Sequence, residues 1–311
     1  MNTSTTLNTL PSISELNQKL GWPASPLIGT SKVQRLYDRA VLRGDGNFFE
    51  NVLRELDVDW ELASGAFENI PKEGPLVIVA NHPFGGLDGL VLGAALARVR
   101  PDFKLLLNHL LSVFPALEAW SIPVDPFGDE PKAKNLQSMR RSFEYLRRGG
   151  CLVVFPAGKV SHFQWKQKCV LDGEWNSHAA ALAKKTGAKV VPVYFEGRNS
   201  LPFQGAGLVH PRLRTVLLPR ELMNKSGSTL RFCVGNPIGP EKIRKFETPE
   251  SLNHYLRLST YALKGQGESQ SPAIETEFSE SVQSPVMAEI AASTLSNCIA
   301  SLPEEAELLR R

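Results

Sequence analysis

The feature that most constrains the fold of this 311-residue chain is a series of short segments that are apolar on both faces. Residues 75–80 read PLVIVA and residues 151–155 read CLVVF. A strand with apolar residues at every position must be covered on both sides of its sheet, which is typical of parallel strands connected by helices. We therefore predict strands at 75–80, 103–107, 121–124, 151–155, 189–195, 213–218 and 229–234.

Segments in which apolar residues recur every three or four positions separate these strands and predict helices. Two of them, at 31–43 and 46–57, precede the first strand. The alternation predicts an α/β fold, with a mixed, largely parallel sheet covered by helices and an N-terminal helical region. The helices between the strands are expected at 88–99, 110–118, 131–148, 176–187 and 248–264.

Composition divides the chain into three parts. We expect residues 1–70 to form a surface segment and a helical pair, residues 71–264 to form the α/β domain, and residues 265–311 to form an acidic linker and tail with one helix at 286–300. The tail carries eight acidic and two basic side chains, whereas the rest of the chain carries 33 basic against 24 acidic ones. A basic body favours an anionic partner such as anionic lipid or a phosphate-bearing carrier. We expect no nucleic acid, because no binding motif accompanies the basic residues.

The cysteines and the hydropathy pattern exclude several classes of protein. The four cysteines lie far apart and form no C-x-x-C pair, which argues against a zinc site or a disulfide framework and favours a reducing compartment. The N-terminal residues lack the basic and apolar regions of a signal peptide. No run of 18 uncharged apolar residues is present to span a membrane. These observations together predict a cytoplasmic location.

His82 and Asp88 flank a glycine turn directly after the first predicted strand, in the stretch NHPFGGLDG. Loops at the carboxyl ends of strands carry function in open α/β sheets. Gly85 and Gly86 permit a tight reversal that can bring the carboxylate against the imidazole. Such a pair fixes the tautomer of the ring, so that its other nitrogen can accept a proton. The alternative is structural, because an aspartate before an apolar helical run also caps a helix.

Three further stretches join NHPFGGLDG in a recognisable order: SIPVDPFG at 121–128, FPAGKVS at 155–161 and VVPVYFEG at 190–197. Together they resemble the four sequence blocks of the glycerolipid acyltransferase superfamily, which includes the lysophospholipid acyltransferases. NHPFGGLDG resembles its His-Asp signature and FPAGKVS resembles its Phe-Pro-Glu-Gly block. The likeness is greatest to the hemolysin-like branch, which includes the acyltransferase half of bifunctional ornithine-lipid synthases. In those proteins an N-acyltransferase domain follows, so the tail could lead to a second domain.

The resemblance implies a glycerol-3-phosphate acyltransferase-like fold and a reaction in which a fatty acyl chain moves from a thioester to a lipid hydroxyl. His82 is then the general base and Asp88 orients it. The implied donor is acyl carrier protein or coenzyme A, with no cofactor besides that donor and no metal. The implied acceptor is a lipid, which places the enzyme peripherally on the inner face of the cytoplasmic membrane.

The same resemblance assigns a set of substrate-binding residues. The backbone amides of three glycines in this set, at 85, 86 and 158, are expected to stabilise the oxyanion of the tetrahedral intermediate. The lysine of the set is expected to face an anionic group of the acceptor or the carrier. The implied residues are Asn81, Gly85, Gly86, Phe155, Pro156, Gly158, Lys159 and Ser161.

The chain also departs from the pattern of the superfamily. Five residues rather than four separate His82 from Asp88. Ala157 stands where a glutamate is usual, and Val160 and Pro126 stand where arginines are usual. Loss of a bidentate arginine removes a strong contact to phosphate. We therefore expect a phosphorus-free acceptor such as lyso-ornithine lipid. Two alternatives stay open: a 1-acylglycerol-3-phosphate O-acyltransferase that makes phosphatidic acid, and a lipid-binding protein without catalysis.

Overall fold

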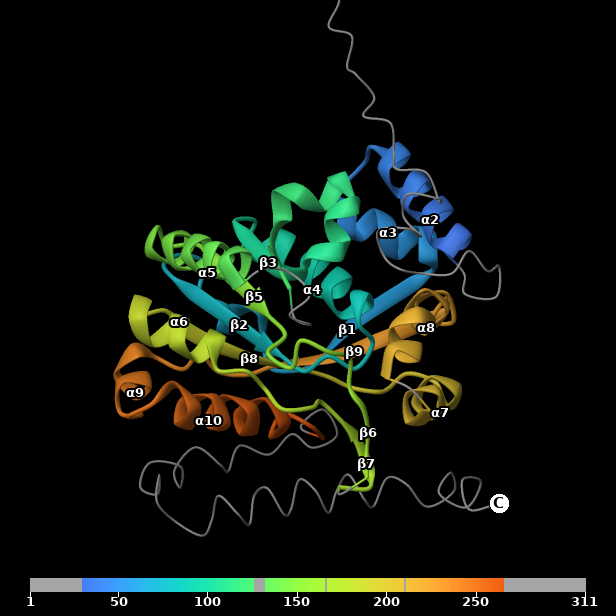
Figure 1. Cartoon of the computed structure of the whole chain (residues 1–311). Helices are drawn as coiled ribbons and strands as arrows, with labels where there is room; N and C mark the ends of the chain where they lie inside the picture. Colours follow the sequence, from blue (N-terminus) through green and yellow to red (C-terminus); the bar gives the residue numbers. More distant parts are fainter. Residues whose placement is uncertain (1–29, 126–131, 166, 210, 266–311) are drawn as a thin grey trace, which may run out of the picture.

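A seven-stranded sheet forms the centre of the computed structural model, which describes residues 30–125, 132–165, 167–209 and 211–265 (Figure 1). In spatial order its strands are β1 (Val58–Ser64), β9 (Ser228–Val234), β8 (Lys189–Phe195), β2 (Leu76–Ala80), β5 (Cys151–Val154), β3 (Phe103–Asn108) and β4 (Ser121–Val124). The five strands from β8 to β4 run parallel, whereas β9 is antiparallel to β8 and parallel to β1. The predicted mixed, largely parallel sheet is therefore confirmed.

Helices cover both faces of this sheet, as the apolar strands require. On one face pack α3 (Phe48–Leu56) and α4 (Gly86–Val99), with α2 (Thr30–Arg43) against α3. The other face is covered by α5 (Lys132–Arg147), α6 (His178–Thr186), α9 (Pro240–Arg244) and α10 (Pro249–Tyr261). A helical hairpin of α7 (Leu201–Val209) and α8 (Pro211–Met223) touches α2 and α4 through α8 (Figure 1).

Strand β2 shows why the apolar pattern predicts the layers. Its five residues are completely buried. Because successive side chains of a strand point to opposite faces, Leu76, Ile78 and Ala80 pack on the α3–α4 side, and Val77 and Val79 pack on the α6–α10 side. A charge at any of these positions would enter one of the two cores.

Arg100 ties the amino ends of three neighbouring strands together. Its guanidinium is 1% exposed and donates to the carbonyl oxygens of Pro71, Gly74 and Gly149 at 2.6–2.7 Å. It also pairs with Asp102, with 2.6 Å between Nε and Oδ1. Gly74 precedes β2, Gly149 precedes β5 and Asp102 precedes β3, so this buried arginine aligns the strands at the edge where they begin.

Two of the predicted elements are wrong. The segment predicted as a strand at 213–218 is part of helix α8. A short apolar run does not distinguish a strand from a packed helix. The helix predicted at 110–118 is instead two 3-10 helices, η3 (His109–Val113) and η4 (Pro115–Trp120). Pro115 interrupts it, because the residue before a proline avoids helical geometry and Phe114 is extended.

Several short elements were not predicted. Strand β1 lies at the edge of the sheet and is only partly buried, so its sequence VDWELAS carries a weak apolar signal. The others are η2 (Phe67–Asn69), the hairpin of β6 (His162–Gln164) and β7 (Cys169–Leu171), and helices α7 and α9. The other predicted strands and helices of this region are confirmed, whereas the helix predicted at 286–300 and the surface segment before residue 30 lie outside the described residues.

Among the helices that the structure describes, none combines the length and the apolar character needed to cross a bilayer.

Two glycines of α4 provide a matched test of this packing. A Cβ at Gly93 would lie 2.4 Å from Cδ1 of Phe49, whose ring is 1% exposed and packs against Phe103 and Trp120. We expect Gly93→Ala to lower the free energy of unfolding by about 1–3 kcal/mol through overpacking. A Cβ at Gly89 meets nothing within 4 Å, so Gly89→Ala should be neutral or stabilising by up to about 1 kcal/mol. Urea unfolding measures both, and equal effects would contradict the packing described here.

Candidate active site

Three neighbouring parallel strands bring three of the predicted sequence blocks to one edge of the sheet. Strands β8, β2 and β5 are adjacent, so the loops that follow them begin side by side. The loop after β2 carries His82, and the loop after β5 carries residues 155–161. The fourth block does not join them. Its strand β4 is separated from β2 by β5 and β3, and residues 126–128 lie outside the described residues.

His82 and Asp88 face each other across the glycine turn. The imidazole Nδ1 lies 3.0 Å from Oδ2 of Asp88. The Asp88 side chain is fully buried, whereas the His82 side chain is 18% exposed. Because Nδ1 itself is buried, the exposed part of the histidine lies away from the carboxylate. The edge of the His82 imidazole opposite Asp88 therefore faces outward.

The carboxylate of Asp88 also caps helix α4. Its Oδ2 accepts hydrogen bonds from the backbone amides of Phe84 and Gly85, each at 3.0 Å. Burial raises the pKa of Asp88, and the interactions with His82 and the two amides oppose that rise. The expected approach of Asp88 to His82 and the capping of α4 thus occur together, since one oxygen atom makes both sets of contacts, and the catalytic role of the pair stays a prediction.

The backbone and the ring of His82 are held by the segment that follows β5. The Phe155 ring stacks on the imidazole, with centroids 4.2 Å apart and planes inclined by 28°. The carbonyl of His82 accepts a hydrogen bond from the amide of Ser161 at 2.8 Å. The amide of His82 donates to Oδ1 of Asp172 at 3.1 Å. The position of His82 is therefore fixed by contacts with the segment after β5 and with Asp172, as well as by its own loop.

Asp172 was not predicted, yet it connects the two loops of the site. It is 1% exposed, and its Oδ1 accepts from the His82 amide and from the Ser161 hydroxyl. Its Oδ2 accepts from Nε1 of Trp175 at 2.8 Å, and its amide donates to the Tyr261 hydroxyl at 3.0 Å. Burial raises the pKa of Asp172, while these donors oppose the rise. In the sequence it stands in an Asp-Gly pair, which reads only as a turn.

The glycine amides expected to stabilise an oxyanion differ in availability. Those of Gly85 and Gly158 already donate, to Asp88 Oδ2 and to the Phe155 carbonyl, each at 3.0 Å. The amide of Gly86, the first residue of α4, has no such partner within the described ranges. Its Cα is open, since an added Cβ would meet nothing within 4 Å. Gly86 is therefore the one of these three amides that is free to bind a ligand, and the roles of the other two in substrate binding stay predictions.

Among the remaining predicted residues, three are buried and make hydrogen bonds within the protein, and one is exposed. Asn81 and Ser161 are buried, and their side chains bond to the protein: the Asn81 amide pairs with both backbone groups of Phe195 at 2.7 and 2.9 Å, and the Ser161 hydroxyl donates to Asp172. The Pro156 carbonyl accepts from the Asn176 amide. Asn81, Pro156 and Ser161 therefore hold the loops around His82 in place. Lys159, by contrast, is exposed. The roles of all four in binding substrate stay predictions.

A half-buried lysine that the sequence analysis missed lies on the other side of the turn. The Nζ of Lys225 is 4.6 Å from the centroid of the Phe84 ring and donates to the Arg198 carbonyl at 3.1 Å. Burial lowers the pKa of Lys225, and the charges of Glu221 and Asp88 raise it. Nothing in its sequence context distinguishes it from a surface lysine.

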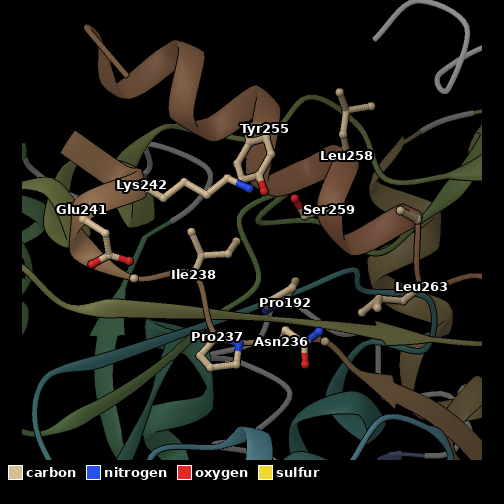
Figure 2. Close-up of a pocket in the computed structure, with 13 residues that line it drawn as sticks. Pro192, Asn236, Pro237, Ile238, Glu241, Lys242, Tyr255, Leu258, Ser259 and Leu263 are labelled. Carbon is tan, nitrogen blue, oxygen red and sulfur yellow. The ribbon is translucent and has the colours of Figure 1, made fainter. Parts of the chain in front are cut away.

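Two pockets lie on the α6–α10 side and do not include His82 or Asp88 in their linings. One, of about 340 Å³, lies between the ends of β8 and β9 and helices α9 and α10, where Lys242 points across the Tyr255 ring with Nζ 4.9 Å from its centroid (Figure 2). The other, of about 610 Å³, is lined by Trp175 and Arg257, which both bond to Asp172. The second pocket thus adjoins the residues that support the site.

Asp172→Asn tests the support of His82. The amide group keeps one acceptor oxygen and puts an N–H₂ donor against either Trp175 or the His82–Ser161 pair. We expect a loss of about 1–3 kcal/mol in the free energy of unfolding and, through misplacement of His82, a loss of about ten- to hundred-fold in the activity of the folded protein. Thermal unfolding and initial rates measure the two effects.

Trp175→Phe is the matched control, because it removes the indole donor on Oδ2 and some buried ring volume but leaves the Asp172 contact to His82. It should lower the free energy of unfolding by about 1–3 kcal/mol while activity stays close to that of the wild type. An Asp172→Asn variant with full activity would show that Asp172 does not position His82.

Comparisons with known proteins identify the family of the chain. Residues 43–269 match the family model described as acyltransferase. A lyso-glycine lipid O-acyltransferase of Bacteroides thetaiotaomicron is 30% identical over 224 residues, which cover 70% of this chain and 79% of that protein. The same enzyme of Phocaeicola vulgatus is 28% identical over 229 residues, which cover 70% and 77% of the two chains.

Among solved structures, the 1-acyl-sn-glycerophosphate acyltransferase PlsC of Thermotoga maritima is 18% identical with a TM-score of 0.44, and the match covers 83% of this chain and 97% of that chain. The family match extends over more than half of the chain and includes the whole of the His82 site. The chain therefore belongs to the acyltransferase family, within the lysophospholipid acyltransferase superfamily, and is an O-acyltransferase.

Proposed function

We propose that this O-acyltransferase moves a fatty acyl chain from an acyl thioester to the hydroxyl of a phosphorus-free lyso-lipid of the amino-acid type. The observation that carries the proposal is the contact of His82 Nδ1 with the buried carboxylate of Asp88. A carboxylate at Nδ1 favours the tautomer that carries its proton there, which leaves the lone pair of Nε2 for an incoming hydroxyl.

The reaction then needs no covalent enzyme intermediate. Nε2 of His82 takes the proton as the acceptor oxygen attacks the thioester carbonyl, and Asp88 stabilises the imidazolium that forms. The tetrahedral intermediate expels the thiolate as the C–S bond breaks, and the imidazolium returns its proton to that sulfur. The free amide of Gly86, at the positive end of the α4 dipole, supports the negative charge on the intermediate.

The loop after β5 supports the choice of a phosphorus-free acceptor. Val160 takes the place of the arginine expected there, and its Cγ2 lies 3.1 Å from where a Cβ on Gly85 would stand. An apolar methyl group therefore fills the space beside the catalytic turn. The two curated relatives are lyso-glycine lipid O-acyltransferases. Lyso-glycine lipid is thus the first acceptor to test, and lyso-ornithine lipid, which the sequence resemblance favours, is the second.

The donor and the location form part of the same proposal. Acyl carrier protein and coenzyme A are the two thioesters to compare, with no further cofactor. A lipid acceptor requires the enzyme to work at a membrane surface, and we place it peripherally on the inner face of the cytoplasmic membrane.

Variants of the pair test the mechanism. We expect His82→Ala to lower the rate of acyl transfer by about 10²- to 10⁴-fold, because a general base is lost. Asp88→Asn keeps an oxygen that can cap α4 and should lower the rate as well. His178→Ala, in the pocket beside α10, is the matched control and should leave the rate unchanged. Near-normal transfer by His82→Ala would refute the mechanism.

A competition assay tests the acceptor. Equal amounts of lyso-glycine lipid, lyso-ornithine lipid and lysophosphatidic acid are offered with one radiolabelled acyl thioester, and the products are separated by chromatography. We expect the label in the amino-acid lipids, because the site lacks the bidentate arginine for a phosphomonoester. Label mainly in phosphatidic acid would contradict the proposed acceptor while leaving the O-acyltransferase activity in place.

A further inference from the structure

Helix α8 lies against the catalytic turn. Cδ2 of Leu218 is 3.2 Å from the position that a Cβ on Gly85 would take, on the same glycine that Val160 crowds from the β5 loop. Gly85 has a φ of +77°, so a side chain there would be strained as well as crowded. The turn that carries His82 is therefore enclosed between the β5 loop and α8.

Arg214 stands one helical turn before Leu218 on α8. Residues four positions apart share a face of a helix, so Arg214 lies on the face that meets the catalytic turn. Burial lowers the pKa of His162, the residue after Ser161, and the charge of Arg214 lowers it further. Arg214 therefore lies beside the loop that holds the His82 carbonyl.

The guanidinium of Arg214 lacks a counter-ion. It is half-buried and forms no hydrogen bond or ion pair with any residue that the structure describes. Burial lowers the pKa of Arg214, and no acidic neighbour opposes that effect. A guanidinium nevertheless stays charged at physiological pH. A partly dehydrated cation without a partner is costly to the free protein, and an anionic ligand would offset that cost.

The charges that act on His162 have both signs. Arg214 and Lys159 lower the pKa of His162, whereas Asp172 raises it. The nearest buried carboxylate in this loop, Asp172, is already occupied by donors from His82, Ser161 and Trp175. Arg214 on α8 thus brings a guanidinium to the side of the β5 loop, which lacks an arginine at position 160.

We propose that Arg214 binds the anionic head group of the acceptor, the free carboxylate of an N-acylated amino-acid lipid, and so determines acceptor specificity. This inference rests on the proposed function. A planar guanidinium can form two parallel hydrogen bonds to a carboxylate. The carboxylate would anchor the head group on α8 while the hydroxyl of the same lipid reaches His82.

Steady-state kinetics of three variants test the role of Arg214. Arg214→Gln should raise the KM for lyso-glycine lipid by about 10- to 100-fold, with little change in the KM for the thioester donor. Arg214→Lys keeps the positive charge but cannot form two parallel hydrogen bonds, so its KM for lyso-glycine lipid should lie between those of the wild type and Arg214→Gln. Arg220→Gln, an exposed arginine on the same helix, is the matched control and should match the wild type. A rise confined to the donor KM would assign Arg214 to the thioester and overturn the inference.

A binding measurement separates this inference from the proposed reaction, because it needs no turnover. The probes are N-decanoylglycine and its methyl ester, titrated by calorimetry below their micelle concentrations. The wild type and His82→Ala should bind the acid about tenfold or more tightly than the ester, and Arg214→Gln should lose that preference. If Arg214→Gln keeps the preference, the inference fails, whether or not the enzyme transfers acyl groups to amino-acid lipids. If the wild type shows the preference but no transfer, the proposed acceptor fails and the anion site stands.

Discussion

The side-by-side parallel alignment of β8, β2 and β5 is the constraint on which the site depends. Parallel neighbours end at one edge of the sheet, so loops that are about seventy residues apart in the chain emerge together. Buried polar groups hold this alignment at both ends of the strands. Arg100 joins the starting ends of β2, β5 and β3, and Asn81 joins β2 to the end of β8 through the backbone of Phe195. Because these groups are buried, the loss of either partner would leave unpaired polar atoms.

Two buried aspartates turn that alignment into a defined position for one histidine. Asp88 holds the ring from the helix side, and Asp172 holds the backbone from the β5 side. Each carboxylate also has a structural task, since Asp88 caps α4 and Asp172 bonds to Trp175. The atoms that stabilise these two loops are therefore the same atoms that position His82. Such sharing keeps the histidine fixed without a separate set of supporting residues.

The electrostatics around this histidine differ from those that the sequence blocks alone suggest. The β5 loop has alanine and valine in place of the usual glutamate and arginine, so the loop itself contributes only Lys159. Positive charge near the two loops also comes from α8 and the segment after it, where Arg214 acts on His162 and Lys225 lies against the Phe84 ring. Neither Arg214 nor Lys225 belongs to a recognisable motif.

Local sequence carries a large part of this architecture because strands with apolar residues in every position permit few other arrangements. The order of apolar strands and helices predicts the α/β sheet, and the glycine turn in NHPFGGLDG predicts the approach of Asp88 to His82. The edge strand β1 escaped prediction because a half-exposed strand has a weak pattern, and α8 was assigned as a strand because a short apolar run has no unique period. Asp172 and Arg214 lie 90 and 132 residues from His82 in the chain. The contact of Asp172 with His82 and the place of Arg214 beside His162 depend on packing between distant segments, and no periodicity or spacing in the sequence encodes a contact of that kind.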